Sequence, residues 1–186
     1  MLINNVRNYN SGKLDFLNYI NLSNEDLLTI LEYRNHVEVR KMMSNHKEIQ
    51  TIEHFRYVEK LKQNINNFYW IVKKNENIIG AIYLNNLNYE MRSAYWGIFL
   101  NPNYIGTGVG VEVEFEGMKV FFKEFGFNYI KAEVLNNNID SHSIQAKFNF
   151  REVENNINSV IYELTREDWL RLPETYKEFK RQNILR

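Results

Sequence analysis

The sequence predicts an α/β protein with a mixed, mostly antiparallel central sheet flanked by helices. Strand-like and helix-like patterns occur in the order strand, helices, three strands, helix, strand, helix, two strands, which is typical of helices packed around one sheet. The 186 residues fit one domain. Only two prolines occur, Pro102 and Pro173, and no low-complexity linker divides the chain. We therefore expect residues 1–186 to form a single domain.

The first third of the chain predicts a strand followed by helices. Residues 14–20 are typical of a short strand, and Ser23-Asn24-Glu25-Asp26 predicts a helix start with Ser23 as the N-cap and acids in the first turn. Thr51 begins a second predicted helix. Its apolar residues recur at helical spacing: Phe55, Val58, Leu61 and Ile65.

The middle of the chain predicts three neighbouring antiparallel strands. They are rich in aromatic and β-branched residues and cover residues 68–73, 78–87 and 93–100. The linkers 74–77 and 88–90 suit hairpin turns. Aromatic residues alternate along these strands, so one half should enter the core while the other half could stack on a sugar or a uracil base.

A long amphipathic helix follows a glycine cluster. Its predicted core face holds Val111, Phe115, Met118, Phe122 and Phe125, and its predicted polar positions are Glu112, Glu116, Lys119 and Lys123. The remaining predicted elements are a strand at 129–135, a helix at 139–148, a hairpin of 150–153 with 159–164, and a charged helical tail from Arg166.

Composition excludes several classes of function. Lys and Arg number 23 and Asp and Glu number 23, so no overall charge attracts nucleic acid or an anionic membrane. The absence of cysteine excludes disulfides, thiolate metal centres and a nucleophilic thiol. The His, Asp and Glu residues show no convincing metal spacing, so no metal is expected. The N-terminus lacks the apolar block of a signal peptide and no window is long enough to span a membrane, so we expect a cytoplasmic protein.

The segment Tyr104-Ile105-Gly106-Thr107-Gly108-Val109-Gly110-Val111 is the most informative motif. Its glycines lie between a predicted strand and a predicted helix, where backbone N–H groups and the helix dipole can hold a pyrophosphate. A Walker A loop requires a Gly-Lys-Ser/Thr ending that is absent here, and the dinucleotide fingerprint has a different spacing. A plain glycine turn without a ligand is the alternative.

Together with Asn136-Asn137-Asn138-Ile139-Asp140-Ser141 and Lys147-Phe148-Asn149-Phe150, this motif resembles the GNAT superfamily of acetyl-CoA-dependent N-acetyltransferases. Ile105 stands where that superfamily usually has Gln or Arg, whereas Gly108 and Gly110 match it. The resemblance implies the GNAT fold and acetyl-CoA as co-substrate. The residues that it implies for the cofactor are Ile98, Phe99, Leu100, Ile105, Gly106, Thr107, Gly108, Val109, Gly110, Val111, Asn138, Ser141, Gln145 and Lys147.

The segment from Leu31 to Met43 is similar to the N-terminal helices of one GNAT branch. That branch acetylates the 4-amino group of a UDP-linked 4-amino-4,6-dideoxy N-acetyl sugar in pseudaminic acid biosynthesis, for flagellin glycosylation. Related acetyltransferases of amino acids and ribosomal proteins also have an Arg-Asn near this point. The resemblance implies a nucleotide-sugar substrate and is compatible with a homodimer. The implied substrate-binding residues are Arg34, Asn35, His36, Met42, Trp70 and Tyr95.

Acetyl transfer to an amine requires a neutral amine, an oxyanion donor and a leaving thiolate. Candidate bases are His36, Glu90 and Tyr95. The family commonly draws its oxyanion donor from backbone N–H groups where the fourth strand splays, here at 98–100. Gln145 stands where the family usually has a Tyr acid. Three rival functions therefore stay open: a transferase for a protein N-terminus or an amino acid, a GNAT module that binds acyl-CoA without catalysis, and, less supported by the neutral charge, a nucleic-acid-binding module.

Overall fold

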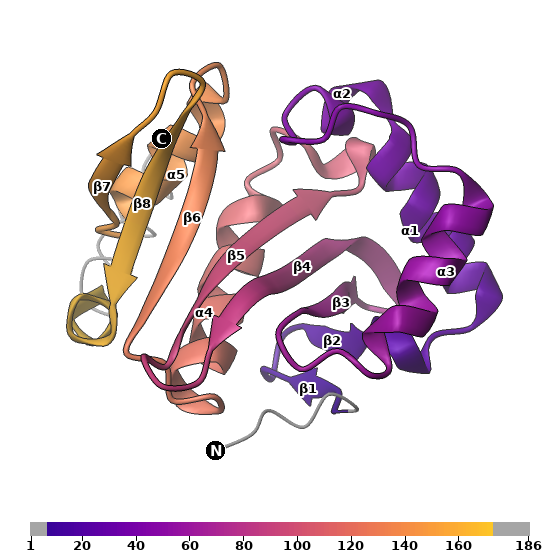
Figure 1. The fold of residues 1–186 in the computed structure, drawn as a ribbon, viewed down its shortest axis with the longest axis horizontal. Coiled ribbons are helices and arrows are strands. Elements are labelled where there is room, and N and C mark those ends of the chain that lie inside the picture. The colour runs from indigo at the N-terminus through magenta and orange to yellow at the C-terminus, as the bar shows by residue number, and fades with distance from the viewer. Residues whose placement is uncertain (1–6, 173–186) are drawn as a thin grey trace.

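A computed structural model describes residues 7–172. Eight strands form one sheet in the order β1-β2-β3-β4-β5-β6-β8-β7 (Figure 1). Every neighbouring pair is antiparallel except β5 and β6, which run parallel. The predicted mixed, mostly antiparallel sheet is thus confirmed.

Most of the predicted boundaries agree with the structure within a few residues. The strands are β1 (Tyr9–Asn10), β2 (Asp15–Asn18), β3 (Phe68–Lys74), β4 (Asn77–Asn88), β5 (Ser93–Leu100), β6 (Tyr129–Leu135), β7 (Arg151–Asn155) and β8 (Ser159–Thr165). The helices are η1 (Tyr19–Asn21), α1 (Asn24–Asn35), α2 (Val37–Arg40), α3 (Thr51–Leu61), η2 (Pro102–Tyr104), α4 (Val109–Lys123) and α5 (Ile139–Lys147). Residues 166–172 are also helical, and the rest of the predicted tail lies outside the described residues.

Local side-chain chemistry accounts for the helix ends. The hydroxyl of Ser23 accepts a hydrogen bond from the N–H of Asp26 at 3.1 Å, so the predicted N-cap is confirmed. α3 stops at Leu61, because the side chain of Asn64 then accepts bonds from the N–H groups of Asn66 and Asn67 and forms a turn. Ile65 therefore lies outside the helix and is exposed, which corrects the prediction.

Two further corrections concern α4. The helix ends at Lys123, so Phe125 packs against the core from the following loop. Glu116 was expected on the polar face, but only 1% of it is exposed. Its carboxylate pairs with Lys119 at 2.8 Å and Lys13 at 3.6 Å, and these partners stabilise the buried charge.

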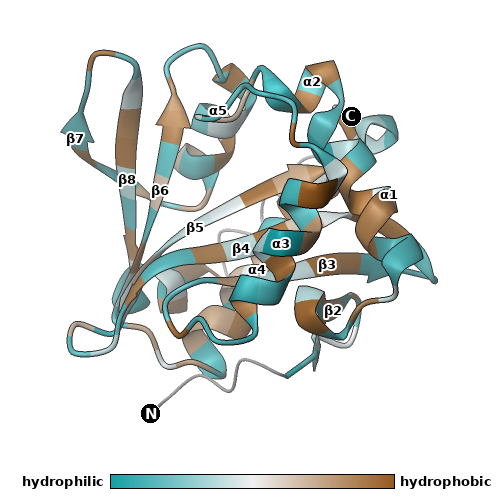
Figure 2. Cartoon of the chain, turned by 45° about the vertical axis from the view of Figure 1, so that its right-hand side comes forward, coloured by the Kyte–Doolittle hydropathy of each residue, from teal (hydrophilic) through white to brown (hydrophobic). Residues whose placement is uncertain are grey.

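The sheet separates two apolar layers. α4 covers one face, where Trp70 and Phe121 belong to the larger core cluster, and α1 and α3 cover the other, where Ile71 belongs to the smaller cluster (Figures 1 and 2). The successive residues Trp70 and Ile71 enter opposite layers because side chains alternate along a strand.

The parallel pair β5 and β6 opens toward one end. The two strands pair only over four residues each, Ser93 to Trp96 of β5 opposite Tyr129 to Ala132 of β6. Beyond these residues the strands diverge (Figure 1). The edge of β5 that faces β6 therefore has no strand partner beyond Trp96. Across residues 7–172, no helix combines the length and the apolar character that a membrane span requires.

Candidate active site

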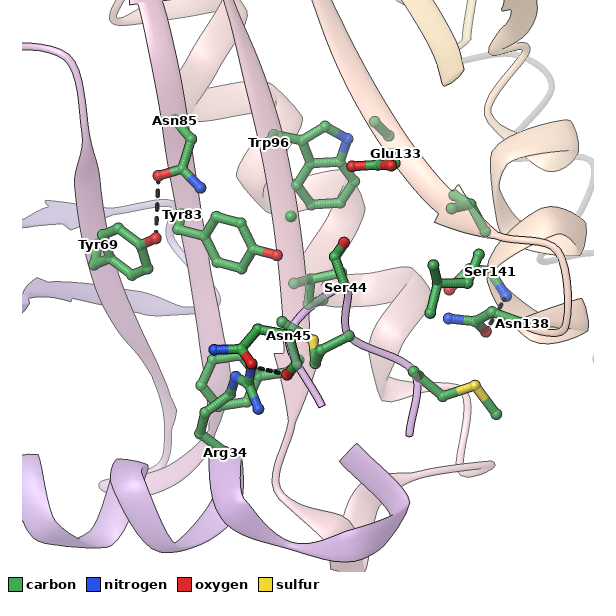
Figure 3. A pocket seen from close by; sticks show the side chains of 18 of the residues that line it. Arg34, Ser44, Asn45, Tyr69, Tyr83, Asn85, Trp96, Glu133, Asn138 and Ser141 are labelled. Carbon is green, nitrogen blue, oxygen red and sulfur yellow. Dashed lines mark hydrogen bonds between the residues drawn. The ribbon is translucent and has the colours of Figure 1, made fainter. Parts of the chain in front are cut away.

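A cavity of about 590 Å³ lies where β5 and β6 diverge. Its walls come from β3, β4, β5 and β6, from η1, α1 and α3, from the segment 42–49, and from α5 with its N-cap (Figure 3). The cavity thus lies at a parallel strand pair that separates, where backbone groups of β5 face open space.

Tyrosines form one wall of this cavity. The rings of Tyr69 and Tyr83 stack with centroids 5.1 Å apart and an interplanar angle of 16°, and Tyr57 contacts Tyr69 edge-on at 5.4 Å. Burial raises the pKa of Tyr57 and of Tyr83, so both phenols stay neutral at physiological pH. The Tyr83 ring crosses β5 at Gly97, where any Cβ would lie 2.2 Å from the Tyr83 Cζ atom. The absence of a side chain at Gly97 therefore leaves room for the Tyr83 ring.

Arg34 supplies a cation to the same cavity (Figure 3). Its Nη2 donates to the carbonyl oxygen of Asn45 at 2.9 Å, while its Nη1 is buried and has no hydrogen-bond partner. Burial lowers the pKa of the guanidinium, and neighbouring tyrosines oppose this effect. Arginine remains protonated in proteins even after such a shift. The unpaired Nη1 is therefore a charged donor available to an anion.

Unpaired polar groups concentrate around this cavity. Among residues 7–172, the buried side-chain atoms without a partner are Arg34 Nη1, Arg40 Nε, His54 Nε2, Trp96 Nε1, Glu114 Oε1 and Gln145 Oε1. Four of these six residues line the cavity, namely Arg34, His54, Trp96 and Gln145. Because buried polar groups are normally hydrogen-bonded, their concentration here indicates a ligand site.

Acid–base groups also face the cavity. Glu133, on the diverging part of β6, accepts a hydrogen bond from the Ser159 hydroxyl at 2.8 Å and lies near Trp96 in Figure 3. Burial lowers the pKa of His54, and a hydrogen bond with the Leu27 backbone opposes the shift. His54 is therefore neutral at physiological pH.

The glycine loop precedes α4 and leaves its donors free. The N–H groups of Gly106, Gly108 and Gly110 donate to no acceptor in the described part of the chain. Gly106 has φ 77° and Gly108 has φ 83°, in the left-handed region that favours glycine. Around a Cβ at either position lies only open space, whereas a Cβ at Gly110 would contact Leu100. The loop can therefore admit an anion closely, beside the end of β5.

α5 supplies the other side of the gap. The Asn138 side chain accepts a hydrogen bond from the N–H of Ser141 at 3.2 Å and caps the helix (Figure 3). Gln145 follows two turns later, is only 4% exposed and lines the cavity. His142 instead contacts the Tyr162 hydroxyl at 2.7 Å and the Leu135 carbonyl at 3.1 Å, so it is oriented toward β8 and β6.

The cavity brings together seven of the 21 site residues expected from the sequence. Those that line the cavity are Arg34, Met42, Ile98, Phe99, Asn138, Ser141 and Gln145. Ile105, Thr107, Val109 and Val111 lie with the glycines before and within the first turn of α4, and Lys147 is exposed at the end of α5.

Five expected residues lie elsewhere. His36 is exposed and caps α2 through its Nδ1. Asn35 exchanges hydrogen bonds with the backbone of Ile49 at 2.8 and 2.9 Å, so it shapes the adjoining loop. Glu90 lies in the exposed turn after β4, and Trp70 is 1% exposed in the opposite layer. Tyr95 lines a neighbouring groove with Asn86 and Glu154, among others.

The sequence did not predict four residues that lie at or beside the cavity, namely Glu53, Tyr57, Glu114 and Glu133. Tyr57 and Glu133 come from elements that meet only in the folded chain, so no local spacing pairs them. A signal did exist for the tyrosine wall: Gly97 interrupts an aromatic strand, and a glycine there indicates close approach of another group. Across the described residues, no group of three or more His, Asp and Glu side chains could hold a metal ion.

Comparison with known proteins defines the class. Residues 17–151 match the family model described as an acetyltransferase (GNAT) domain, so the chain belongs to the GNAT acetyltransferase family. The predicted family, fold class and activity, acetyl-CoA-dependent N-acetyl transfer, are confirmed.

The chain is similar to individual acetyltransferases in sequence and in fold. The chain is 31% identical over 121 residues to acetyltransferase PseH from Campylobacter jejuni strain 81-176, covering 65% of this chain and 74% of that protein. The crystal structure of Campylobacter jejuni N-acetyltransferase PseH in complex with acetyl coenzyme A superposes with a TM-score of 0.69 at 24% identity, over 82% of this chain and 98% of that one. Spermidine N-acetyltransferase from Vibrio cholerae in complex with CoA and spermine gives a TM-score of 0.74 at 18% identity, over 86% and 99%.

Proposed function

We propose that this acetyltransferase acetylates the 4-amino group of a nucleotide-linked amino sugar. The observation that carries the proposal is the combination in one cavity of the free, charged Nη1 of Arg34 with the stacked rings of Tyr69 and Tyr83. A guanidinium suits a diphosphate, and aromatic faces suit a base or a sugar ring.

For the donor, the glycine loop would hold the pyrophosphate of acetyl-CoA. The free N–H groups of Gly106, Gly108 and Gly110, with the N-terminus of α4, offer donors and a favourable dipole. The acyl arm would then pass Asn138 and enter the gap between β5 and β6. The unpaired edge of β5 at 98–100 would supply the oxyanion donor.

The acceptor would enter from the side of α1 and α3. Its amine would reach the thioester in the gap, where Glu133 is the carboxylate best placed to take the ammonium proton, directly or through water. The neutral amine then attacks the thioester carbonyl and the N–C bond forms. The resulting positively charged nitrogen gives up its second proton to water, and the C–S bond breaks with its electron pair on sulfur. Glu133 thus replaces His36, Glu90 and Tyr95 as the proposed base.

The cavity also weighs against the acceptor of the Vibrio cholerae neighbours, which are named for spermidine. A polycation would have to lie beside the half-buried charge of Arg34, and like charges repel. The name PseH of the curated relatives, together with the sequence resemblance to the pseudaminic acid branch, supports a nucleotide-sugar acceptor.

Thiol release from acetyl-CoA tests the proposal with three acceptors: a UDP-linked 4-amino-4,6-dideoxy N-acetylhexosamine, a peptide with a free N-terminus, and spermidine. We expect turnover with the sugar. Arg34→Gln should raise its KM about 10–100-fold, as expected for a lost charge-assisted hydrogen bond, with a small change in kcat. Arg40→Gln is the control, because Arg40, at the end of α2, likewise donates to the backbone of the 42–49 segment, at His46, but does not line the cavity.

Two outcomes contradict the proposal. Turnover of the peptide or of spermidine in preference to the sugar would reassign the acceptor. Tight acetyl-CoA binding without turnover of any amine would favour the non-catalytic module. The expected homodimer stays a prediction, and light scattering of the purified chain tests it; a Vibrio cholerae spermidine N-acetyltransferase forms a dodecamer.

A further inference from the structure

A buried carboxyl group lies beside the cavity and has no role in the mechanism so far. Glu114, on α4, is 1% exposed and shares a side-chain hydrogen bond with Gln145 of α5. Gln145 lines the cavity, whereas Glu114 is not part of its wall. The carboxyl group is thus in contact with the residue that occupies the family's acid position.

While Glu114 is ionised, one side-chain oxygen of Glu114 and one of Gln145 receive no hydrogen bond. Glu114 Oε1 and Gln145 Oε1 are both buried acceptors without a donor. Burial raises the pKa of Glu114 well above its usual range, which favours the neutral acid. A protonated carboxyl carries an O–H donor, which an amide oxygen can accept, while its other oxygen accepts from the amide N–H. Such an acid–amide pair would satisfy both unpaired oxygens.

We propose that Glu114 is a positioning residue that fixes the amide of Gln145 so that its second N–H points into the gap and donates a hydrogen bond to the sulfur of the departing coenzyme A. The C–S electron pair goes to sulfur, which leaves as a thiolate. Gln145 keeps its proton, and water later protonates the thiolate. The inference rests on the proposed function only because its test requires an amine that the enzyme acetylates.

This arrangement removes the requirement for a general acid. The cysteine thiol has an unperturbed pKa near 8.5, and thiols are far stronger acids than alcohols, so a thiolate is a leaving group that needs stabilisation more than protonation. A fixed donor in a site shielded from water stabilises developing charge without reorganisation. The substitution of Tyr by Gln therefore changes the way in which the leaving group is stabilised and leaves the transfer intact.

Four variants test the inference through steady-state thiol release with the UDP-linked 4-amino sugar. Glu114→Leu and Gln145→Leu should each lower kcat about 10-fold or more, with little change in the KM for acetyl-CoA, because the lost interaction forms only as the thiolate leaves. The double variant should be no slower than Gln145→Leu. Glu114→Gln should retain kcat within about 3-fold, because a second amide can make both hydrogen bonds with Gln145.

Glu116→Gln is the matched control on the same helix. Glu116 is equally buried but pairs with Lys119 and Lys13, away from the cavity, so this variant should lower stability and leave kcat unchanged. Wild-type kcat in Glu114→Leu would overturn the proposal. If that variant does not fold, Gln145→Leu decides alone: unchanged kcat overturns the proposal. Failure of the wild type to use the sugar would instead contradict the proposed acceptor.

Discussion

At the scale of single residues, the site is marked by polar groups that the fold buries without partners. Arg34, His54, Trp96 and Gln145 come from different elements, yet each presents such a group at one cavity. An unpaired buried group costs stability, so a ligand that supplies the missing partners recovers free energy on binding. The sequence indicated Arg34 and Gln145 through resemblance, but the burial that gives them their character arises only from packing.

The buried Glu114 predicts a particular dependence of stability on pH. Its folded-state pKa is raised above the unfolded value near 4.3, so its favourable contribution is full below that pH and is lost as the pH rises toward the folded pKa. We expect the wild type to lose free energy of unfolding over this interval relative to Glu114→Gln, which does not titrate. Urea denaturation at a series of pH values measures how the free energy of unfolding of each protein changes with pH. The same pH dependence in the wild type and in Glu114→Gln would contradict a raised pKa of Glu114.

At the scale of elements, the sequence predicted strands and helices well wherever the pattern was long. β5 and β6 have the expected bounds because their residues are rich in aromatic and β-branched types. α2, with four residues, and β1, with two, are too short to produce a periodic pattern. Glu116 was misplaced because a local pattern does not reveal Lys13, a partner from the distant N-terminal segment.

The contact of Tyr83 in the tyrosine wall with Gly97 of β5 gives a prediction for one backbone position. Gly97→Ala would place a Cβ 2.2 Å from Tyr83 and displace its ring, so we expect a loss of about 1–3 kcal/mol in unfolding free energy, typical of overpacking, together with a higher KM for the sugar. Gly117→Ala is the control. Gly117 lies within α4, and a Cβ there would be at an ordinary 3.5 Å from Ile82. Because glycine destabilises a helix interior relative to alanine, the free energy of unfolding should rise by about 0.5–1 kcal/mol. Equal effects in both variants would show that Tyr83 does not depend on Gly97.

At the scale of the whole molecule, the order of elements predicted the mixed sheet, and the glycine loop together with segments 136–141 and 147–150 predicted the family. The acceptor site could not be predicted in the same way, because its walls come from α1, α3, β4 and β6, which lie up to a hundred residues apart. Trp70 illustrates the limit. It alternates with Tyr69 along β3, and the sequence pattern does not say which of the two faces the cavity and which faces α4.

The central claim is that the free N–H groups of the loop before α4 hold the pyrophosphate of acetyl-CoA. Calorimetric titration of acetyl-CoA into the wild type, Gly108→Val and Gly12→Val tests it most directly. Gly12 is a matched control, because it also has a positive φ, 89°, and open space around its Cβ, and it belongs to the turn between β1 and β2. The account predicts lost binding in Gly108→Val and wild-type affinity in Gly12→Val. Undiminished affinity in Gly108→Val would contradict it.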